Sequence, residues 1–147
     1  MAQADDVRRL CLAQPEVLEQ DYHGVPTFRV AGRKFASLHP VGASHFADID
    51  FQEPAVVVHL DREDQRGLAE AYPEAILPHR YFARHGWAVV VLRLVDEALL
   101  GLLLRMAWAC VAPKRLLRRG RLQRRKAEDR VARFAAALSR RRGNRLG

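Results

Sequence analysis

The strongest structural signal in the chain lies between residues 81 and 117, where a continuous apolar run is followed by apolar residues at helical spacing. Residues 88–92 (AVVVL) form a β-branched apolar run of strand length. From Leu99 to Cys110 apolar residues recur at steps of three and four, which places them on one face of a helix. The pattern predicts a buried strand followed by a buried helix. We expect the inward face of this helix to consist of Leu99, Leu102, Leu103, Met106 and Cys110, with Leu100, Leu104, Trp108 and Val111 widening it.

Both ends of this helix are marked by residues that favour helix termini. Asp96 stands where an N-cap is expected, and Glu97 follows in the first turn, where the helix dipole favours an anion. At the other end, Pro113 disfavours helical geometry at Ala112. We therefore expect the helix to begin after Asp96 and to end before Pro113.

Shorter patterns upstream predict four further strands. Residues 55–60 (AVVVHL) repeat the buried apolar type, whereas residues 17–22 carry three consecutive polar side chains and indicate an exposed or edge strand. Residues 27–30 and 34–38 alternate in the manner of strands around residues 31–33, which predicts a hairpin.

Two further helices complete the expected order of elements. The first is capped by Asp5 or Asp6, and the second begins after Asp61 and runs to Ala71. Residues 76–78 are expected to connect this second helix to the strand at residues 88–92. The expected order is helix, four strands, helix, strand and helix, with the helices on one side of a mainly antiparallel sheet.

A set of short phrases is spread over about residues 7–117. They are Val7–Leu12 (VRRLCL), Pro15, Pro26–Val30 (PTFRV), Gly32, Lys34–Ala36, Tyr81, Arg84–Trp87 (RHGW), Ala107–Trp108 and Val111–Leu116 (VAPKRL). In this order and spacing they resemble the MmcQ/YjbR family. The resemblance implies an α+β, CyaY-like (frataxin-like) domain of two layers, with a mainly antiparallel sheet and helices packed on one face. It also implies DNA binding, the property by which this family is usually described.

Charge is distributed unevenly along the chain, whose formal net charge is +8. The segment from Lys114 to Gly147 has fourteen basic and two acidic residues, a net of +12, so the preceding residues carry −4. Apolar residues recur at helical spacing between Val131 and Leu138. We therefore expect a domain of residues 1–117 and a basic tail of residues 118–147 that is partly helical or disordered.

The remaining chemistry of the sequence favours neither a catalytic site nor a metal site. Cys11 and Cys110 are both expected to be buried and reduced, and no CxxC pair is present. The six histidines lack the spacing of known metal sites. No apolar run approaches the ~20 residues of a membrane span, and the N-terminus does not have the pattern of a signal peptide. We expect a cytoplasmic protein without cofactor, metal, stable membrane insertion or enzymatic activity.

Basic residues at two places are candidates for a binding surface. Before the strand at residues 88–92, Arg84, His85 and Trp87 combine phosphate-binding groups with a ring that can stack on a base. The structural alternative is that Trp87 packs on the core while Gly86 permits a tight turn. The second group follows Pro113 and consists of Lys114, Arg115, Arg118 and Arg119. Its structural alternative is that these cations complement the C-terminus of the last core helix.

These residues lead to a functional hypothesis and its alternatives. We expect Arg84, His85, Trp87, Lys114 and Arg115 to lie near one another and to form part of a surface for DNA or RNA. The alternative is a module that binds a protein or a small ligand, with a protein partner docking on the basic tail. A basic amphipathic helix in the tail could also lie on an anionic membrane.

Overall fold

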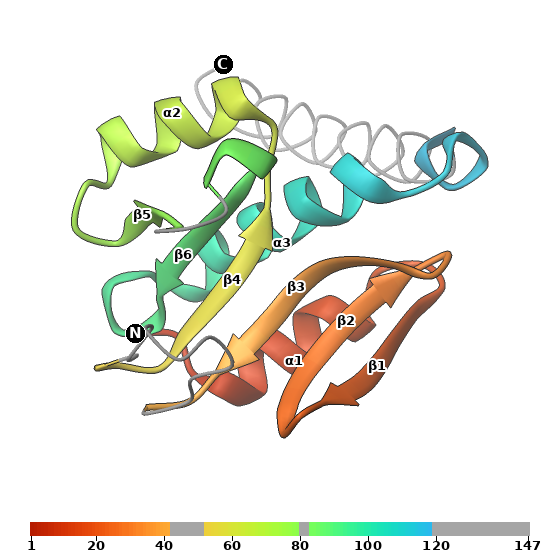
Figure 1. The fold of residues 1–147 in the computed structure, drawn as a ribbon, viewed down its shortest axis with the longest axis horizontal. Coiled ribbons are helices and arrows are strands. Elements are labelled where there is room, and N and C mark those ends of the chain that lie inside the picture. The colour runs from red at the N-terminus through yellow and green to blue at the C-terminus, as the bar shows by residue number, and fades with distance from the viewer. Residues whose placement is uncertain (42–51, 80–82, 119–147) are drawn as a thin grey trace, which may run out of the picture. The chain divides into compact units, whose positions relative to one another are not determined.

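The computed structural model describes residues 1–41, 52–79 and 83–118 of the chain, and within them six strands form one antiparallel sheet (Figure 1). The order across the sheet is β1-β2-β3-β4-β6-β5, so β1 and β5 are its edges. As its polar pattern predicts, β1 is largely exposed. The strands are β1 (Val17–Tyr22), β2 (Val25–Val30), β3 (Arg33–His39), β4 (Ala55–His59), β5 (Ile76–Pro78) and β6 (Trp87–Val91).

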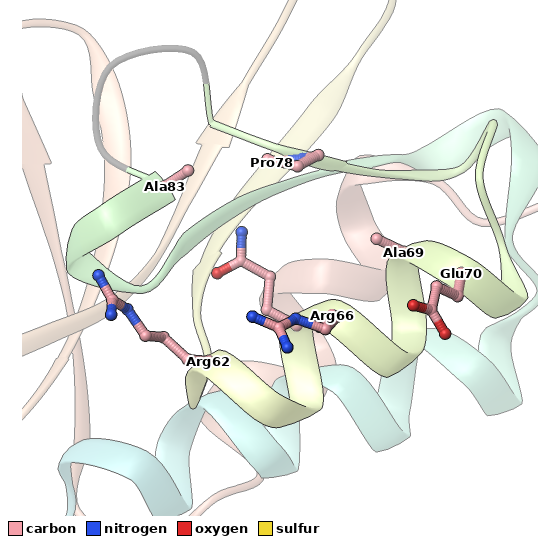
Figure 2. Close-up of a pocket in the computed structure, with 7 residues that line it drawn as sticks. Arg62, Arg66, Ala69, Glu70, Pro78 and Ala83 are labelled. Atoms are coloured by element: carbon pink, nitrogen blue, oxygen red, sulfur yellow. The ribbon is translucent and has the colours of Figure 1, made fainter.

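Helices cover one face of this sheet. The α-helices are α1 (Ala4–Leu12), α2 (Arg62–Ala71) and α3 (Glu97–Val111), and two short 3-10 helices, η1 (Ala83–His85) and η2 (Leu92–Leu94), flank β6. In the view of Figure 1, α1 and α3 lie behind the sheet, and α2 runs beside β5, as the close-up in Figure 2 also shows. The expected α+β fold, with a mainly antiparallel sheet and helices on one face, is confirmed.

The sheet has one strand more than the sequence predicts. Residues 76–78, expected to be a connection, pair with β6 as strand β5. Three residues are too few to show the alternation that identifies a strand, so this element depends on its pairing partner. Its position matters because β5 faces α2 along the groove described below.

The ends of α3 lie where the sequence predicts them. The Leu99 amide donates a hydrogen bond to the Asp96 side chain at 2.7 Å, so Asp96 is the N-cap. The helix ends at Val111, and Ala112 has an extended conformation with a ψ of 144°. Pro113 explains this conformation, because the proline ring disfavours helical geometry in the residue before it.

The predicted inward face of α3 is partly wrong. Leu103 is fully buried, but Leu102 is 43% exposed, Met106 is only half-buried, and Cys110 is exposed. Because α3 is apolar almost all round, its periodicity allowed more than one face to be chosen. The buried face consists of Leu100, Leu103, Leu104, Ala107, Trp108 and Val111. Their spacing is that of one helical stripe, and Leu102 lies on the outer side with Arg105.

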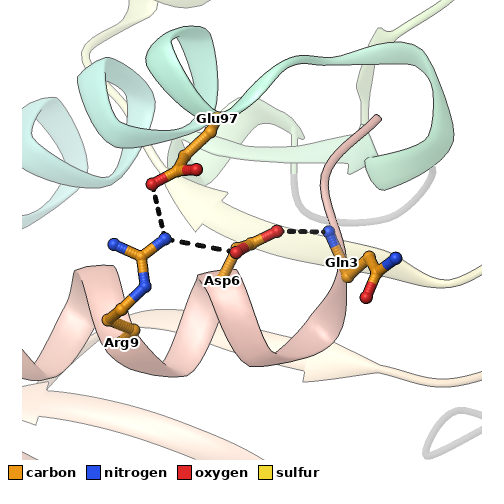
Figure 3. A network of polar contacts seen from close by, with 4 residues as sticks. All are labelled: Gln3, Asp6, Arg9 and Glu97. Atoms are coloured by element: carbon orange, nitrogen blue, oxygen red, sulfur yellow. Dashed lines mark hydrogen bonds and ion pairs between the residues drawn. The ribbon is translucent and has the colours of Figure 1, made fainter.

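The N-terminal helix begins earlier than predicted. Its N-cap is Gln3 rather than Asp5 or Asp6, and the Gln3 amide donates to the Asp6 carboxylate at 2.9 Å. Asp6 therefore caps the helix from inside its first turn, which sequence spacing does not distinguish from an N-cap. Arg9 bridges Asp6 to Glu97, so the same network joins α1 to α3 (Figure 3). The hydrogen bond from the Gln3 backbone, followed by that from Arg9, lowers the pKa of Asp6.

Two tight hairpins connect the first three strands. Ala31 and Gly32 have φ values of 50° and 77°, and His23 and Gly24 have φ values of 50° and 84°. Two consecutive positive φ angles identify two-residue turns of type I′, which match the twist of the flanking strands. The predicted hairpin at residues 31–33 is confirmed.

The chain divides into two compact units, Met1–Ala112 and Pro113–Gly147. All the helices and strands named above belong to the first unit, in which Cys11 is buried and has a free thiol. The second unit is described only as far as Arg118, and residues 114–118 are helical. The rest of the predicted basic tail, from residue 119 onward, lies outside the described residues. None of the described helices has the length and apolar character needed to cross a bilayer.

Candidate functional site

The turn before β6 carries three of the predicted site residues. Arg84 and His85 are exposed in η1, and Trp87 is the first residue of β6. Between them, Gly86 is buried with a φ of 89°, and a β-carbon there would lie 2.8 Å from the Leu60 carbonyl oxygen. The Leu60 amide donates to the Gly86 carbonyl at 2.7 Å. The backbone therefore requires glycine here, and it fixes where Arg84 and His85 emerge.

Trp87 is half-buried and has a packing role. Its side chain packs against Ala55 and Val57, and its ring meets the His59 ring edge-on with a centroid distance of 5.0 Å. The Lys34 ammonium lies 4.8 Å from the Trp87 ring centroid, within the range of a cation–π interaction. Burial, and secondarily the charge of Arg29, lowers the pKa of Lys34. One face of the indole thus already has a partner, which favours the structural alternative for Trp87.

A groove between α2 and the segment around β5 and η1 is lined by two further arginines, Arg62 and Arg66 of α2 (Figure 2). One guanidinium nitrogen of Arg62 donates to the Arg84 carbonyl oxygen at 3.2 Å. Arg62 and Arg66 are one helical turn apart and are both exposed. The cavity has a volume of about 410 Å³ and is lined by Arg62, Gln65, Arg66, Ala69, Glu70, Pro78 and Ala83. We call it the arginine groove.

Sequence reasoning missed Arg62 and Arg66. The available signal was their spacing of four residues on one helix, which places both on the same side. Glu63 and Asp64 lie between the two arginines and cancel their charge, so the net charge of this segment does not reveal them. The groove itself could not be found from spacing, because its opposite wall comes from Pro78 and from η1.

Gln65 connects the arginine groove to β6. It is the buried residue of α2, and its side-chain nitrogen donates to the Trp87 carbonyl oxygen at 3.3 Å. A buried amide normally has such a partner because an unpaired polar group away from water is costly. The hydrogen bond holds α2 at the beginning of β6, so it also positions Arg62 and Arg66 relative to η1.

His59 and Cys110 form a close polar pair at the end of β4. The His59 Nδ1 atom lies 3.2 Å from the Cys110 sulfur. Although Cys110 is exposed, partial desolvation of its sulfur raises the pKa of the thiol, and the carboxylates of Asp61 and Asp64 raise it further. Burial also lowers the pKa of His59. Both shifts favour the neutral thiol and the neutral imidazole, whereas a nucleophilic cysteine requires the thiolate.

The described part of the chain contains no group of three His, Cys, Asp or Glu side chains that could hold a metal ion. His45, Asp48 and Asp50 lie outside the described residues. His39 belongs to β3 and is buried, with its Nε2 atom 2.9 Å from the Ser37 hydroxyl.

The second group of predicted site residues belongs to the second unit. Lys114, Arg115 and Arg118 are exposed on the helical segment that follows Pro113, and Arg119 lies outside the described residues. The prediction that Lys114 and Arg115 share a surface with Arg84, His85 and Trp87 stays a prediction.

The YjbR family model matches residues 12–110. A crystal structure of a Deinococcus radiodurans protein with a DUF419 domain has 27% sequence identity and a TM-score of 0.61, over 78% of this chain and 81% of that one. A protein from Pseudomonas syringae shares the fold at 12% identity with a TM-score of 0.56, over 71% of this chain and 95% of that one. The search of curated proteins found no match. Because the family model spans most of the sheet and helices, the chain belongs to the YjbR family.

Proposed function

We propose that this protein binds nucleic acid without catalysing a reaction, through phosphate contacts from basic side chains. The observation that carries the proposal is the arginine groove, which is lined by Arg62 and Arg66 of α2, with Arg62 bonded to the backbone carbonyl oxygen of Arg84 in η1. Guanidinium groups bind phosphate through paired hydrogen bonds, and such contacts supply most of the affinity of nonspecific nucleic-acid binding. Family membership supports the proposal because the sequence resemblance implies DNA binding.

The charge distribution supports different roles for two regions of the chain, one in local phosphate contact and one in long-range attraction. Residues before Lys114 carry a net charge of −4, so the arginine groove is a local basic site on a mildly acidic domain. The segment from Lys114 onward carries +12 and supplies the long-range attraction to a polyanion. Lys114, Arg115, Arg118 and Arg119 are the phosphate-contacting residues proposed in that segment.

The absence of catalysis is part of the same proposal. The His59–Cys110 pair has the short distance of a nucleophile and its base, but the directions of both pKa shifts oppose formation of a thiolate. A side chain that binds phosphate, in contrast, needs only a permanent positive charge and access to solvent. Arg62, Arg66 and Arg84 have both.

The test is a fluorescence titration with duplex DNA, single-stranded DNA and RNA at two salt concentrations. We expect affinity to fall steeply with salt, with a log–log slope near about −5 if roughly six phosphates are contacted. Deletion of residues 120–147 should flatten this slope and leave the first unit folded. Affinities weaker than about 10⁻⁴ M for all three nucleic acids at physiological salt would contradict the proposal, since nonspecific binders usually exceed that affinity.

The arginine groove also favours a second candidate, a small anionic ligand. Its volume of about 410 Å³ lies within the range of ~300–1,000 Å³ that is typical of small-molecule sites. If the titrations show no nucleic-acid binding, a small anion in this groove becomes the leading function.

A further inference from the structure

We propose that the arginine groove holds one unpaired nucleotide, so that the protein binds single-stranded nucleic acid in preference to a duplex. This inference rests on the proposed function and specifies its ligand. Besides the carboxylate of Glu70, the lining contains three kinds of group that can contact a nucleotide: the guanidinium groups of Arg62 and Arg66, the carboxamide of Gln65, and the apolar surface of Ala69, Pro78 and Ala83. These groups match the three parts of a nucleotide: guanidinium groups bind a phosphate, a carboxamide pairs with a base edge, and an apolar surface packs against a base face.

The phosphate would bind at the α2 side of the groove. Arg62 and Arg66 are exposed and one turn apart on the same helix, so their guanidinium groups can bind one phosphate or two successive ones. The hydrogen bond from Arg62 to the Arg84 carbonyl oxygen uses one of its five N–H donors and holds its guanidinium beside η1. Figure 2 shows both arginines on the helix that borders the groove.

The base edge would meet Gln65. Its nitrogen donates to the Trp87 carbonyl oxygen, and this bond assigns the orientation of the amide. Among the described residues this is the only hydrogen bond of the Gln65 side chain, which leaves its oxygen and its second N–H available on a residue that is only 7% exposed. A carboxamide with an adjacent acceptor and donor pairs with the edges of nucleobases. A buried amide with unused capacity beside a groove therefore points to a ligand with a complementary edge.

Pairing of the target base decides between a single strand and a duplex. In a duplex the base edge is engaged with its partner, and a base must be unpaired and unstacked, at a cost of a few kcal/mol, before it can enter a protein pocket. A single strand does not require unpairing. The cavity of about 410 Å³ is a single pocket of small-molecule size. The geometry therefore favours one nucleotide with its base inserted and its phosphate on the arginines.

The test fills the groove without touching its charges. Ala69→Leu adds bulk inside the groove on a helix that tolerates leucine, and Ala71→Leu adds the same bulk at an exposed position of α2 outside the lining. In the full-length protein we expect Ala69→Leu to weaken binding to a labelled single-stranded oligonucleotide about tenfold, or about 1.4 kcal/mol, with duplex binding unchanged. Ala71→Leu should leave both affinities unchanged.

A second variant keeps the inference falsifiable if Ala69→Leu disturbs α2. Gln65→Met has a similar volume but lacks the amide, so it should weaken single-strand binding and leave the salt dependence of binding unchanged. Thermal melting of each variant shows whether the fold is retained.

Two results would overturn the nucleotide groove and leave the proposed function standing: duplex binding as tight as single-strand binding, or equal single-strand affinities for Ala69→Leu and Ala71→Leu. A nucleoside monophosphate that competes as strongly as the oligonucleotide would also overturn it, because the ligand would then be a free nucleotide. Failure of all nucleic acids to bind would overturn both proposals.

Discussion

The helices α3 and α2 lie on the same face of one sheet, but they are built in different ways. Six of the fifteen residues of α3 are buried, and all six are apolar. Of the ten residues of α2 one is buried, and it is the polar Gln65. Helix α3 is thus held by removal of apolar surface from water, whereas α2 is held mainly by its ends and by a directed hydrogen bond. The arginine groove lies along the helix that contributes little to the core.

This difference separates residues that stabilise the fold from residues that are free to bind. A buried leucine of α3 cannot be exchanged without loss of packing, whereas Arg62 and Arg66 use little of their surface in the fold. Gln65 belongs to both groups, because it anchors α2 to Trp87 and also lines the arginine groove. The following substitutions test whether the distinction holds, in order of decreasing effect on stability.

The largest effect is expected in the core of α3. Leu103→Ala should lower the free energy of unfolding by roughly 2–5 kcal/mol, because Leu103 is fully buried and its truncation leaves a cavity. Leu102→Ala is the matched control, since Leu102 is the preceding residue of the same helix and is 43% exposed. It should cost less than about 1 kcal/mol. Urea denaturation measures both, and equal losses would mean that the buried face of α3 is assigned incorrectly.

A smaller loss is expected at the turn that presents Arg84. Gly86→Ala should cost at least about 1–2 kcal/mol, the penalty for an L-residue in left-handed backbone geometry, because φ is 89°. The contact of 2.8 Å to the Leu60 carbonyl oxygen adds to this loss. If thermal melting shows no destabilisation, the turn before β6 does not have the described conformation.

Within α2 the corresponding change should have the opposite sign. A β-carbon at Gly67 would meet no atom within 4 Å, and glycine inside a helix is less favourable than alanine. Gly67→Ala should therefore raise stability by about 0.5–1 kcal/mol, measured by the same melting experiment. A loss of stability would contradict the open space that the structure shows around Gly67.

The pH dependence of stability probes two histidines in the described unit. Burial lowers the pKa of His59 and of His79 below the ordinary value of 6.5. As the pH falls below about 6.5, the unfolded chain binds more protons at these sites than the folded chain, so stability must decrease. His59→Gln and His79→Gln should each reduce the loss of unfolding free energy between about pH 7.5 and about pH 5.5. A variant that loses as much stability as the wild type would contradict the direction of that histidine's pKa shift.

Local features of this fold could be predicted from the sequence, and features that depend on distant contacts could not. Asp96 and Asp61 were identified as caps because a capping hydrogen bond spans two or three residues. The buried face of α3 was partly missed because a helix that is apolar almost all round does not reveal which side the sheet covers. Cys110 was expected in the core for the same reason.

The candidate site depends more strongly on tertiary structure. Arg84 was identified through the residues that precede β6. Arg62, which donates to the Arg84 carbonyl oxygen, and Arg66 became apparent only when α2 was placed beside β5 and η1. The contact between His59 and Cys110 joins residues 51 positions apart, and no spacing rule indicates it. Whether Lys114 and Arg115 act together with Arg84 stays a prediction.

The central claim is that basic residues of the arginine groove contact phosphates. It is tested most directly by replacing one exposed arginine on α2 and, separately, one exposed arginine on α3. Arg66 lies on α2 in the groove lining, and Arg105 is exposed on α3 outside it. The measurement is the salt dependence of single-strand binding by the wild type, Arg66→Ala and Arg105→Ala. The account predicts that Arg66→Ala reduces the magnitude of the log–log slope by about 0.7, the contribution of one phosphate in a single strand, and that Arg105→Ala leaves the slope unchanged. Equal slopes for the two variants would contradict it.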